Sequence, residues 1–143
     1  MARIIGNNFP NLLKGTGGPD LIKGLGSVDA LFGYGGNDKL YGGTANDAIN
    51  GGKGNDRMFG GSGHDFFQFK SGDGNFNTLT GKGDIVMDYD DGLDRFYVPG
   101  SGVGAVTTSV LDTPAGHGTL VEYNGGSFFI LGFDGSFAPD DFK

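Results

Sequence analysis

Large apolar residues recur every nine positions through the first half of the chain. They are Ile22, Leu31, Leu40, Ile49, Met58 and Phe67. A period of nine fits neither an amphipathic helix nor a plain alternating strand. Each nine-residue unit has about six turn-forming residues, followed by three that can be extended. Because successive side chains of a strand point to opposite faces, the pattern predicts short strands that each turn one apolar side chain inward.

Asp and Gly follow the same nine-residue period. Asp stands two residues before each apolar position, and Gly stands five residues before each Asp. The Asp column is Asp20, Asp29, Asp38, Asp47, Asp56 and Asp65, and the Gly column is Gly15, Gly24, Gly33, Gly42, Gly51 and Gly60. A second Gly precedes Asp by two residues in four units, whereas Ser27 and Ala45 take that place in the others. A degenerate unit at residues 6–14 has Asn11 in the Asp column and Leu13 in the apolar column.

Two units make one coil of about eighteen residues, with two short strands on opposite sides. Stacked coils predict an all-β fold, a right-handed parallel β-roll over residues 1–70. Asp20, Asp38 and Asp56, the first column, would then line one edge of the roll, and Asp29, Asp47 and Asp65, the second column, the other. Ser27 and Ala45 stand where the other units have Gly, so we expect slight backbone strain in their two turns.

The nine-residue register ends after Phe69, and stretches of alternating apolar residues follow. These stretches are Ile85–Tyr89, Arg95–Val98, Val103–Leu111, Thr119–Tyr123 and Ser127–Leu131. They predict a C-terminal β cap over residues 71–143 that continues from the roll and covers its open end, because solenoids need capped ends.

Composition supports a repeat fold and excludes several others. Glycine makes up 31 of the 143 residues, several times its usual ~7 %. Collagen is excluded because Gly does not recur every third residue, and the 13 Phe and 36 % hydrophobic content do not fit simple disorder. The absence of Cys excludes disulfides and zinc–thiolate sites.

The charged residues point to a hard cation. Asp and Glu number 17 against 10 Lys and Arg, so the net charge of −7 argues against nucleic acid as a partner. No apolar run approaches the ~20 residues of a membrane span. Stacked like charges ~4.8 Å apart are destabilising unless a cation lies between them, and no Lys or Arg column interleaves with the Asp columns. Carboxylates beside Gly-rich turns that present carbonyls suit Ca²⁺, which takes six to eight oxygen ligands.

Three units closely resemble a known repeat. GYGGNDKLY (33–41), GGKGNDRMF (51–59) and GGSGHDFFQ (60–68) are similar to the nonapeptides of the RTX (repeats-in-toxin) calcium-binding family. GDIVMDYDDGLDRFYV (83–98) resembles the stretch that follows such repeats in serralysin-type proteins, and the layout resembles the R-modules of alginate epimerases. The resemblance implies a calcium-binding module of a larger bacterial protein that leaves the cell by type I export, folds on Ca²⁺ binding outside it, and stabilises or assists export of that protein.

The resemblance also implies the ligands of four or more Ca²⁺ ions, each held between two turns one coil apart. Asp supplies its carboxylate and every other residue its backbone carbonyl. The first column would hold one ion with Thr16, Gly18, Asp20, Gly33, Gly35 and Asp38, and another with Tyr34, Gly36, Asp38, Gly51, Lys53 and Asp56. The second column would hold one with Leu25, Ser27, Asp29, Gly42, Thr44 and Asp47, and another with Gly43, Ala45, Asp47, Gly60, Ser62 and Asp65. Asn11 opposite Asp29 would make a weaker fifth site, and Asp73, Asp84 and Asp88 are candidates for ions at the end of the roll.

No catalytic site is expected. DYDDGLD (88–94) is similar to an EF-hand loop, but its sixth position is Leu93 instead of Gly and its twelfth is not Glu. His64 and His117 are isolated, no HExxH zinc motif exists, and no nucleophile–base pair stands out. The serralysin-like peptidase part is absent, so the chain is predicted not to be an enzyme.

The outward side of the first strand column carries an unusual set of residues. Cations and aromatics share this face, at Lys23, Lys39, Tyr41, Arg57 and Phe59. One interpretation is an ordinary solvated sheet, or a surface under the cap. The alternative is a groove for an anionic, alginate-like polysaccharide, which would make the chain a binding module appended to a carbohydrate-modifying enzyme.

Overall fold

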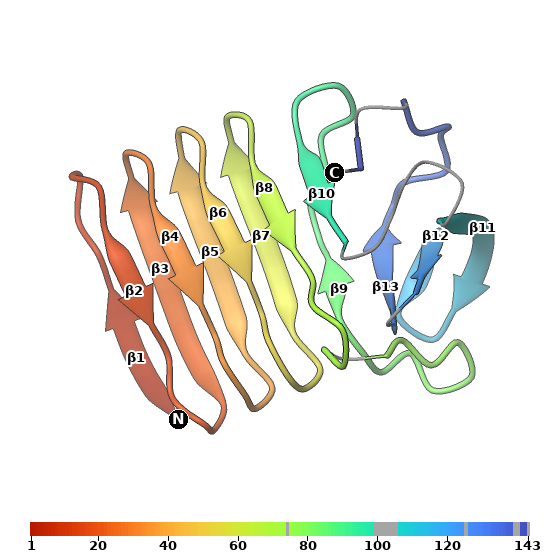
Figure 1. Cartoon of the computed structure of the whole chain (residues 1–143), viewed down its shortest axis with the longest axis horizontal. Coiled ribbons are helices and arrows are strands. Elements are labelled where there is room, and N and C mark those ends of the chain that lie inside the picture. Colours follow the sequence, from red (N-terminus) through yellow and green to blue (C-terminus); the bar gives the residue numbers. More distant parts are fainter. Residues whose placement is uncertain (74, 99–105, 125, 139–140, 143) are drawn as a thin grey trace.

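The computed structural model describes residues 1–73, 75–98, 106–124, 126–138 and 141–142. Every regular element in this part of the chain is a β-strand, and the strands form two sheets. A regular stack of coils occupies one end of the molecule and a more irregular cap the other (Figure 1). The described residues include no helix long and apolar enough to cross a membrane.

The strands alternate between the two sheets along the roll. The larger sheet has the order β1 (Ala2–Ile5), β3 (Asp20–Gly26), β5 (Lys39–Thr44), β7 (Arg57–Ser62), β9 (Ile85–Val86), β13 (Gly126–Leu131), β12 (Gly116–Tyr123) and β11 (Thr107–Thr113). The smaller sheet consists of β2 (Leu12–Lys14), β4 (Ala30–Phe32), β6 (Ala48–Asn50), β8 (Phe66–Gln68) and β10 (Arg95–Tyr97). Each pair of units therefore forms one coil with a strand in each sheet, which confirms the predicted parallel β-roll.

The register of the parallel strands places equivalent repeat positions side by side. Ile22 pairs with Leu40 and Leu40 with Met58, while Leu31 pairs with Ile49 and Ile49 with Phe67. All six of these side chains are fully buried between the sheets, as predicted. The flanking residues of each strand are more exposed, so one apolar residue per unit forms the core of the roll.

Both sheets continue beyond residue 70. β9 pairs with β7 and β10 pairs with β8, so Val86 lies beside Met58 and Phe96 beside Phe67. The division into a roll over residues 1–70 and a cap over residues 71–143 stays a prediction, and the hydrogen-bonded sheets themselves cross that boundary.

The cap adds an antiparallel meander to the larger sheet. β13 pairs in parallel with β9, and β12 and β11 follow in antiparallel order. β10, β12 and β13 overlap the stretches expected at Arg95–Val98, Thr119–Tyr123 and Ser127–Leu131. Of the stretch expected at Ile85–Tyr89, only Ile85–Val86 is a strand. β11 begins at Thr107, and residues 103–105 of its expected stretch lie outside the described residues.

Aromatic side chains join the cap to the core of the roll. Phe67 stacks on Phe96 with ring centroids 5.8 Å apart, and Phe96 lies 5.1 Å from Phe128. Phe69 stacks on Phe128 at 3.9 Å. These buried rings belong to the same cluster as the apolar column of the repeats, so the cap covers the open end of the roll with one continuous core.

Candidate metal centre

The Asp columns lie along the two edges where the strands begin. β3 begins at Asp20, and β5 and β7 begin directly after Asp38 and Asp56. β4, β6 and β8 begin directly after Asp29, Asp47 and Asp65. All six side chains are buried, with exposed fractions of 0–2 %. Turns rich in glycine therefore hold two rows of buried carboxylates, one on each edge, as the repeat predicted.

One oxygen of each carboxylate belongs to a hydrogen-bond ladder. The backbone N–H of Asp20 donates to Oδ1 of Asp38 at 2.8 Å, and the N–H of Asp38 donates to Oδ1 of Asp56 at 2.8 Å. In the second column Asp29 donates to Asp47 at 2.8 Å, and Asp47 to Asp65 at 2.9 Å. Each carboxylate is thus tied to the coil before it, and its orientation is fixed.

The other oxygen of most of these carboxylates has no donor. Oδ2 of each interior Asp is buried and lacks a hydrogen-bond partner within the described structure, namely in Asp29, Asp38, Asp47, Asp56 and Asp65. Leaving a buried charged oxygen unpaired is costly, and native proteins rarely do so without a water or an ion. A row of such oxygens is therefore suited to a cation.

Backbone carbonyls share the space that these free oxygens face. A Cβ added to Gly33 would lie 2.3 Å from both Oδ2 of Asp38 and the carbonyl oxygen of Gly51. At Gly24 the corresponding distances are 2.4 Å to Oδ2 of Asp29 and 2.4 Å to the carbonyl oxygen of Gly42. The column of glycines is therefore required because a side chain would fill the space between a carboxylate and a carbonyl of the next coil.

Each of the four expected ligand sets contains such a pair. Besides Asp38 with Gly51 and Asp29 with Gly42, Gly15 adjoins Oδ2 of Asp20 and the carbonyl of Gly33, and Gly42 adjoins Oδ2 of Asp47 and the carbonyl of Gly60. The donors are hard oxygens, as Ca²⁺ prefers. Among the described residues no three carboxylate or imidazole groups converge on one point, so carbonyls would have to complete each ligand shell.

The turns adopt backbone conformations that side chains usually avoid. Leu25, Ser27, Tyr34 and Ala45 have φ values of 83°, 76°, 73° and 77°. The equivalent residues of other turns, such as Gly36 and Gly43, also have positive φ. These are the second and fourth positions of the repeat, whose carbonyls are expected ligands. The strain expected at Ser27 and Ala45 is confirmed as left-handed backbone, which costs a non-glycine residue roughly 1–2 kcal/mol.

Burial disfavours the charged form of most of these carboxylates when no cation is present. Burial, with neighbouring Asp charges adding to it, raises the pKa of Asp38 and of Asp47 to about 7. Burial likewise raises the pKa of Asp56 to about 6. At Asp20 burial acts in the same direction, but hydrogen bonds donated by Ala2 and Thr16 outweigh it and lower the pKa. The interior carboxylates are therefore the ones whose charge needs a bound cation.

Two cap residues continue the Asp columns. The N–H of Asp56 donates to Oδ1 of Asp84 at 3.0 Å, and the N–H of Asp65 donates to Oδ1 of Asp94 at 2.9 Å. Sequence reasoning named Asp84 only as one of three candidates and missed Asp94, because the intervening loops lengthen the repeat to 28 and 29 residues. The part of the repeat pattern that remains at both Asp84 and Asp94 is the apolar residue two positions later, Val86 or Phe96.

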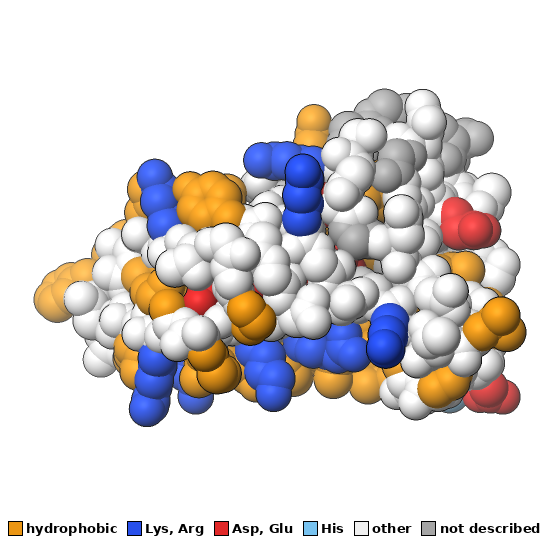
Figure 2. Space-filling view, turned by 90° about the horizontal axis from the view of Figure 1, so that it is seen from below, with side chains coloured by type: hydrophobic (Ala, Val, Ile, Leu, Met, Phe, Trp, Pro, Cys, Tyr) orange, Lys and Arg blue, Asp and Glu red, His pale blue; other side chains and the backbone are white. Residues whose placement is uncertain are grey.

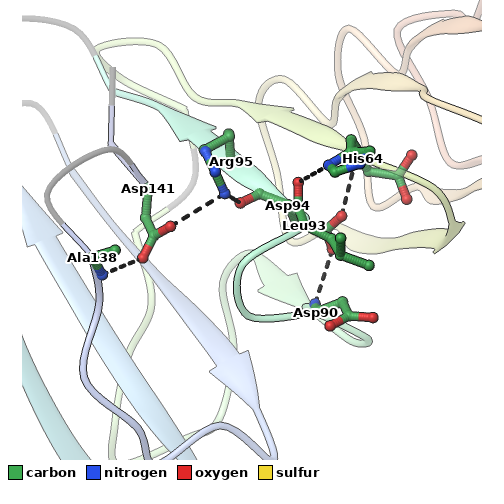
Figure 3. Close-up of polar contacts among 8 residues, drawn as sticks. His64, Asp90, Leu93, Asp94, Arg95, Ala138 and Asp141 are labelled. Carbon is green, nitrogen blue, oxygen red and sulfur yellow. Dashed lines mark hydrogen bonds and ion pairs between the residues drawn. The ribbon is translucent and has the colours of Figure 1, made fainter.

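The turn around Asp94 is fixed by its own hydrogen bonds (Figure 3). Oδ2 of Asp94 accepts the N–H of Asp90 at 3.0 Å, and Nδ1 of His64 lies 3.0 Å from the carbonyl oxygen of Leu93. Asp88 accepts the N–H groups of Gly60 and Gly61 with its two oxygens. The segment 88–94 thus serves to close the second column with satisfied carboxylates.

The outward face of the larger sheet carries the expected cations and aromatics. Tyr41 and Phe59 stack with centroids 4.4 Å apart, and Nζ of Lys23 lies 5.2 Å from the ring centroid of Tyr41. Figure 2 shows Lys and Arg side chains in a row along one side with hydrophobic side chains between them, and little acidic surface on the roll. A cavity of about 340 Å³ is lined by Asn37, Asp38, Lys39, Asn55, Arg57 and Lys82.

Lys82 is a member of this cavity that sequence reasoning missed. It comes from the cap, where it forms an isolated antiparallel β-bridge with Asn77 shortly before β9 begins. Nη1 of Arg57 donates to the carbonyl of the neighbouring Gly83 at 3.0 Å, which holds the guanidinium beside this loop. The cap therefore adds a third cation to Lys39 and Arg57, which no local sequence pattern could show.

Comparison with known proteins identifies the repeats. The model of the RTX calcium-binding nonapeptide repeat (4 copies) matches residues 5–40 and 32–67. Comparison with curated proteins gave no match.

Comparison with solved structures gave matches to two subunits of one epimerase. One is the solution structure of the AlgE6R3 subunit from the Azotobacter vinelandii mannuronan C5-epimerase, at 28 % identity over 96 % of this chain and 80 % of that one, with a TM-score of 0.49. Another is the AlgE6R2 subunit of the same epimerase, at 28 % identity over 97 % of this chain and 90 % of that one, with a TM-score of 0.45. On the match of the repeat model, residues 5–67 of this chain are similar to the RTX calcium-binding nonapeptide repeat.

Proposed function

We propose that the chain is a non-catalytic module that folds when Ca²⁺ binds between its turns, with the four ligand sets named from the sequence. The observation that supports this most directly is the row of buried, unpartnered Oδ2 atoms. Those of Asp29, Asp38 and Asp47 lie close to carbonyls of the next coil. A Ca²⁺ ion in this space would pair each free oxygen and cancel the repulsion between successive carboxylates.

Calcium matters for stability because the core is thin. Each coil of the roll buries only two apolar side chains between its sheets. At a Ca²⁺ concentration tenfold above the dissociation constant each site adds ~1.4 kcal/mol, so four sites add roughly 6 kcal/mol, about the stability of a small domain.

Extracellular calcium modules typically have dissociation constants of ~10⁻⁴–10⁻³ M. We therefore propose that the module stays largely unfolded at cytosolic Ca²⁺ and folds outside the bacterial cell after type I export. In this role it would stabilise, or assist the export of, a larger secreted protein.

Ion counting by native mass spectrometry tests the ligand sets. The unmodified chain should bind at least four Ca²⁺ ions. Asp38→Ala should remove two of them, because Asp38 belongs to both sets of the first column. Asp134→Ala, which changes an exposed carboxylate, should remove none. A chain that binds no Ca²⁺, or an Asp38→Ala variant with an unchanged count, would contradict the proposal.

A second candidate function is binding of an anionic polysaccharide, and the cavity beside β5 and β7 favours it. Three cations, two amides and the buried Asp38 line it, and the stacked Tyr41 and Phe59 lie on the same outward face. Cations suit a uronate carboxylate, and aromatic faces suit the apolar side of a sugar ring. Arg57 is held by hydrogen bonds to the carbonyls of Asp56 and Gly83, so its orientation is set before a ligand arrives.

Titration of Ca²⁺-loaded protein with alginate oligomers tests this second function. Amide resonances of Lys39, Arg57 and Lys82 should shift, and the double variant Lys39→Ala/Lys82→Ala should lose most of the affinity. Lys14→Ala is the matched control, because Lys14 is exposed on β2 of the other sheet. No shifts at saturating Ca²⁺ would leave the face an ordinary solvated sheet.

A further inference from the structure

One buried, unpartnered carboxylate oxygen lies outside the repeats. It is Oδ2 of Asp84, a cap residue that is fully buried. Oδ1 of the same side chain accepts the N–H of Asp56, so only one of its two oxygens is satisfied. A half-satisfied buried carboxylate needs a further positive or donor group as much as any carboxylate of the repeats does.

The hydrogen bond from Asp56 to Asp84 continues the ladder that links neighbouring repeat turns. Asp56 donates to Asp84 at 3.0 Å, as Asp38 donates to Asp56 at 2.8 Å. Oδ2 of Asp56 is also unpartnered. It lies close to Gly51 of its own turn, where an added Cβ would be 2.4 Å from that oxygen. β9, which begins directly after Asp84, continues the sheet register from β7.

We propose that a further Ca²⁺ ion binds between Asp56 and Asp84, in addition to the four ions of the repeats. The inference rests on the proposed calcium-binding function of the repeats and extends it into the cap. The new ion would join the two parts of the molecule. Asp84 accepts the N–H of Phe129 at 3.0 Å with its backbone carbonyl, and β9 pairs with both β7 and β13.

Two other cap carboxylates close to the columns have both oxygens engaged in hydrogen bonds. Asp94 accepts N–H groups with both oxygens, from Asp65 and Asp90, and Asp88 does so from Gly60 and Gly61. Oδ2 of Asp73 accepts the N–H of Lys70 at 2.7 Å. Of the cap carboxylates that the structure describes, Asp84 is thus the one with a buried oxygen that lacks a partner. The first column is extended by an ion, and the second column ends in hydrogen bonds.

Ion counts of two matched repeat variants test the proposal. Among the four repeat sites Asp56 and Asp65 each belong to one, so without a cap ion Asp56→Ala and Asp65→Ala should each lose one Ca²⁺ in native mass spectra. With the cap ion, Asp56→Ala should lose two and Asp65→Ala one. Equal losses for the two variants would overturn the proposal, whereas a wild-type chain that binds no Ca²⁺ would overturn the function of the repeats instead.

A cap variant gives a second measure. Asp84→Asn keeps an oxygen that can accept the N–H of Asp56 but lowers the charge of the site, so it should bind one ion fewer than the wild type while the repeat ions remain. Asp91→Asn, in the exposed part of the 88–94 turn, is the control and should bind the full number. If Asp84→Asn loosens the cap, the comparison of Asp56→Ala with Asp65→Ala still decides, because it changes no cap residue. A full ion count in Asp84→Asn would contradict the proposal.

Discussion

At the scale of single residues, the two oxygens of each interior Asp have separate tasks. Oδ1 ties a coil to its predecessor through a backbone N–H, and Oδ2 is left without a partner. In Asp29, Asp38 and Asp47 this free oxygen lies close to a carbonyl of the next coil. Asn11 shows the contrast, because its Oδ1 accepts the N–H of Asn7 and its Nδ2 lies 3.3 Å from Oδ1 of Asn7. The degenerate unit can therefore satisfy its side chain locally. The weaker fifth site at Asn11 stays a prediction.

Two glycines of the turns, Gly33 and Gly17, give a prediction and its control. Gly33→Ala places a methyl group 2.3 Å from Oδ2 of Asp38 and from the carbonyl of Gly51, so it should displace an ion. Loss of one ion at a tenfold excess of Ca²⁺ over its dissociation constant lowers stability by ~1.4 kcal/mol. Gly17→Ala, whose Cβ would meet nothing within 4 Å, should leave the thermal midpoint of the Ca²⁺-loaded protein nearly unchanged. Equal thermal midpoints for the two variants would show that no ion occupies the space beside Gly33.

The raised pKa values predict opposite pH effects with and without calcium. The pKa is about 7 for Asp38 and Asp47 and about 8 for Asp84 in the folded chain, against ~3.9 for an unfolded Asp. The calcium-free fold therefore binds more protons than the unfolded chain between these values, and its stability should fall as pH rises from about 4 to about 8. Calcium competes with these protons, so its affinity should fall as pH drops below about 7.

Circular dichroism checks both effects. In calcium-free buffer the β signal should be larger at pH 5 than at pH 8, and the Ca²⁺ concentration needed for half-maximal signal should be higher at pH 5.5 than at pH 7.5. A calcium-free β signal that grows with pH would show that the buried carboxylates do not control folding.

At the scale of elements, the repeats could be predicted and the cap only in part. Nine-residue spacing alone places β2 to β8, because parallel pairing needs equal coil lengths, whereas β1 lies before the first recognised unit. In the cap the register depends on loops of unequal length, so Asp94 and the cation at Lys82 reach their neighbours through long-range pairing. The pairing of β9 with both β7 and β13 is likewise set by tertiary packing, and the short stretch Ile85–Val86 carries no sign of it.

The single apolar residue per strand predicts a sharp contrast between two leucines. Leu40 is fully buried on β5, whereas Leu12 on β2 is 61 % exposed. Leu40→Ala should lower the free energy of unfolding of the Ca²⁺-loaded protein by about 2–5 kcal/mol, and Leu12→Ala by under about 0.5 kcal/mol. Urea unfolding at saturating Ca²⁺ measures both values, and a comparable loss for Leu12→Ala would show that the apolar column is not the core.

At the scale of the whole molecule, two features decide whether the roll is stable. A continuous core runs from the repeat column into the aromatic cap, and two rows of buried carboxylates run along its edges. The first stabilises the fold, and the second opposes it until a cation is present. This balance makes folding conditional: the same Gly-rich turns that shape the sites should be disordered without Ca²⁺.

Far-UV circular dichroism of the chain, recorded in EDTA and then in millimolar Ca²⁺, tests this conditional fold most directly. We expect a largely disordered spectrum at neutral pH in EDTA and a cooperative change to a β spectrum as Ca²⁺ is added. Mg²⁺ at the same concentration should produce little change, because it demands stricter octahedral geometry. A β spectrum that is the same in EDTA and in Ca²⁺ would contradict the account.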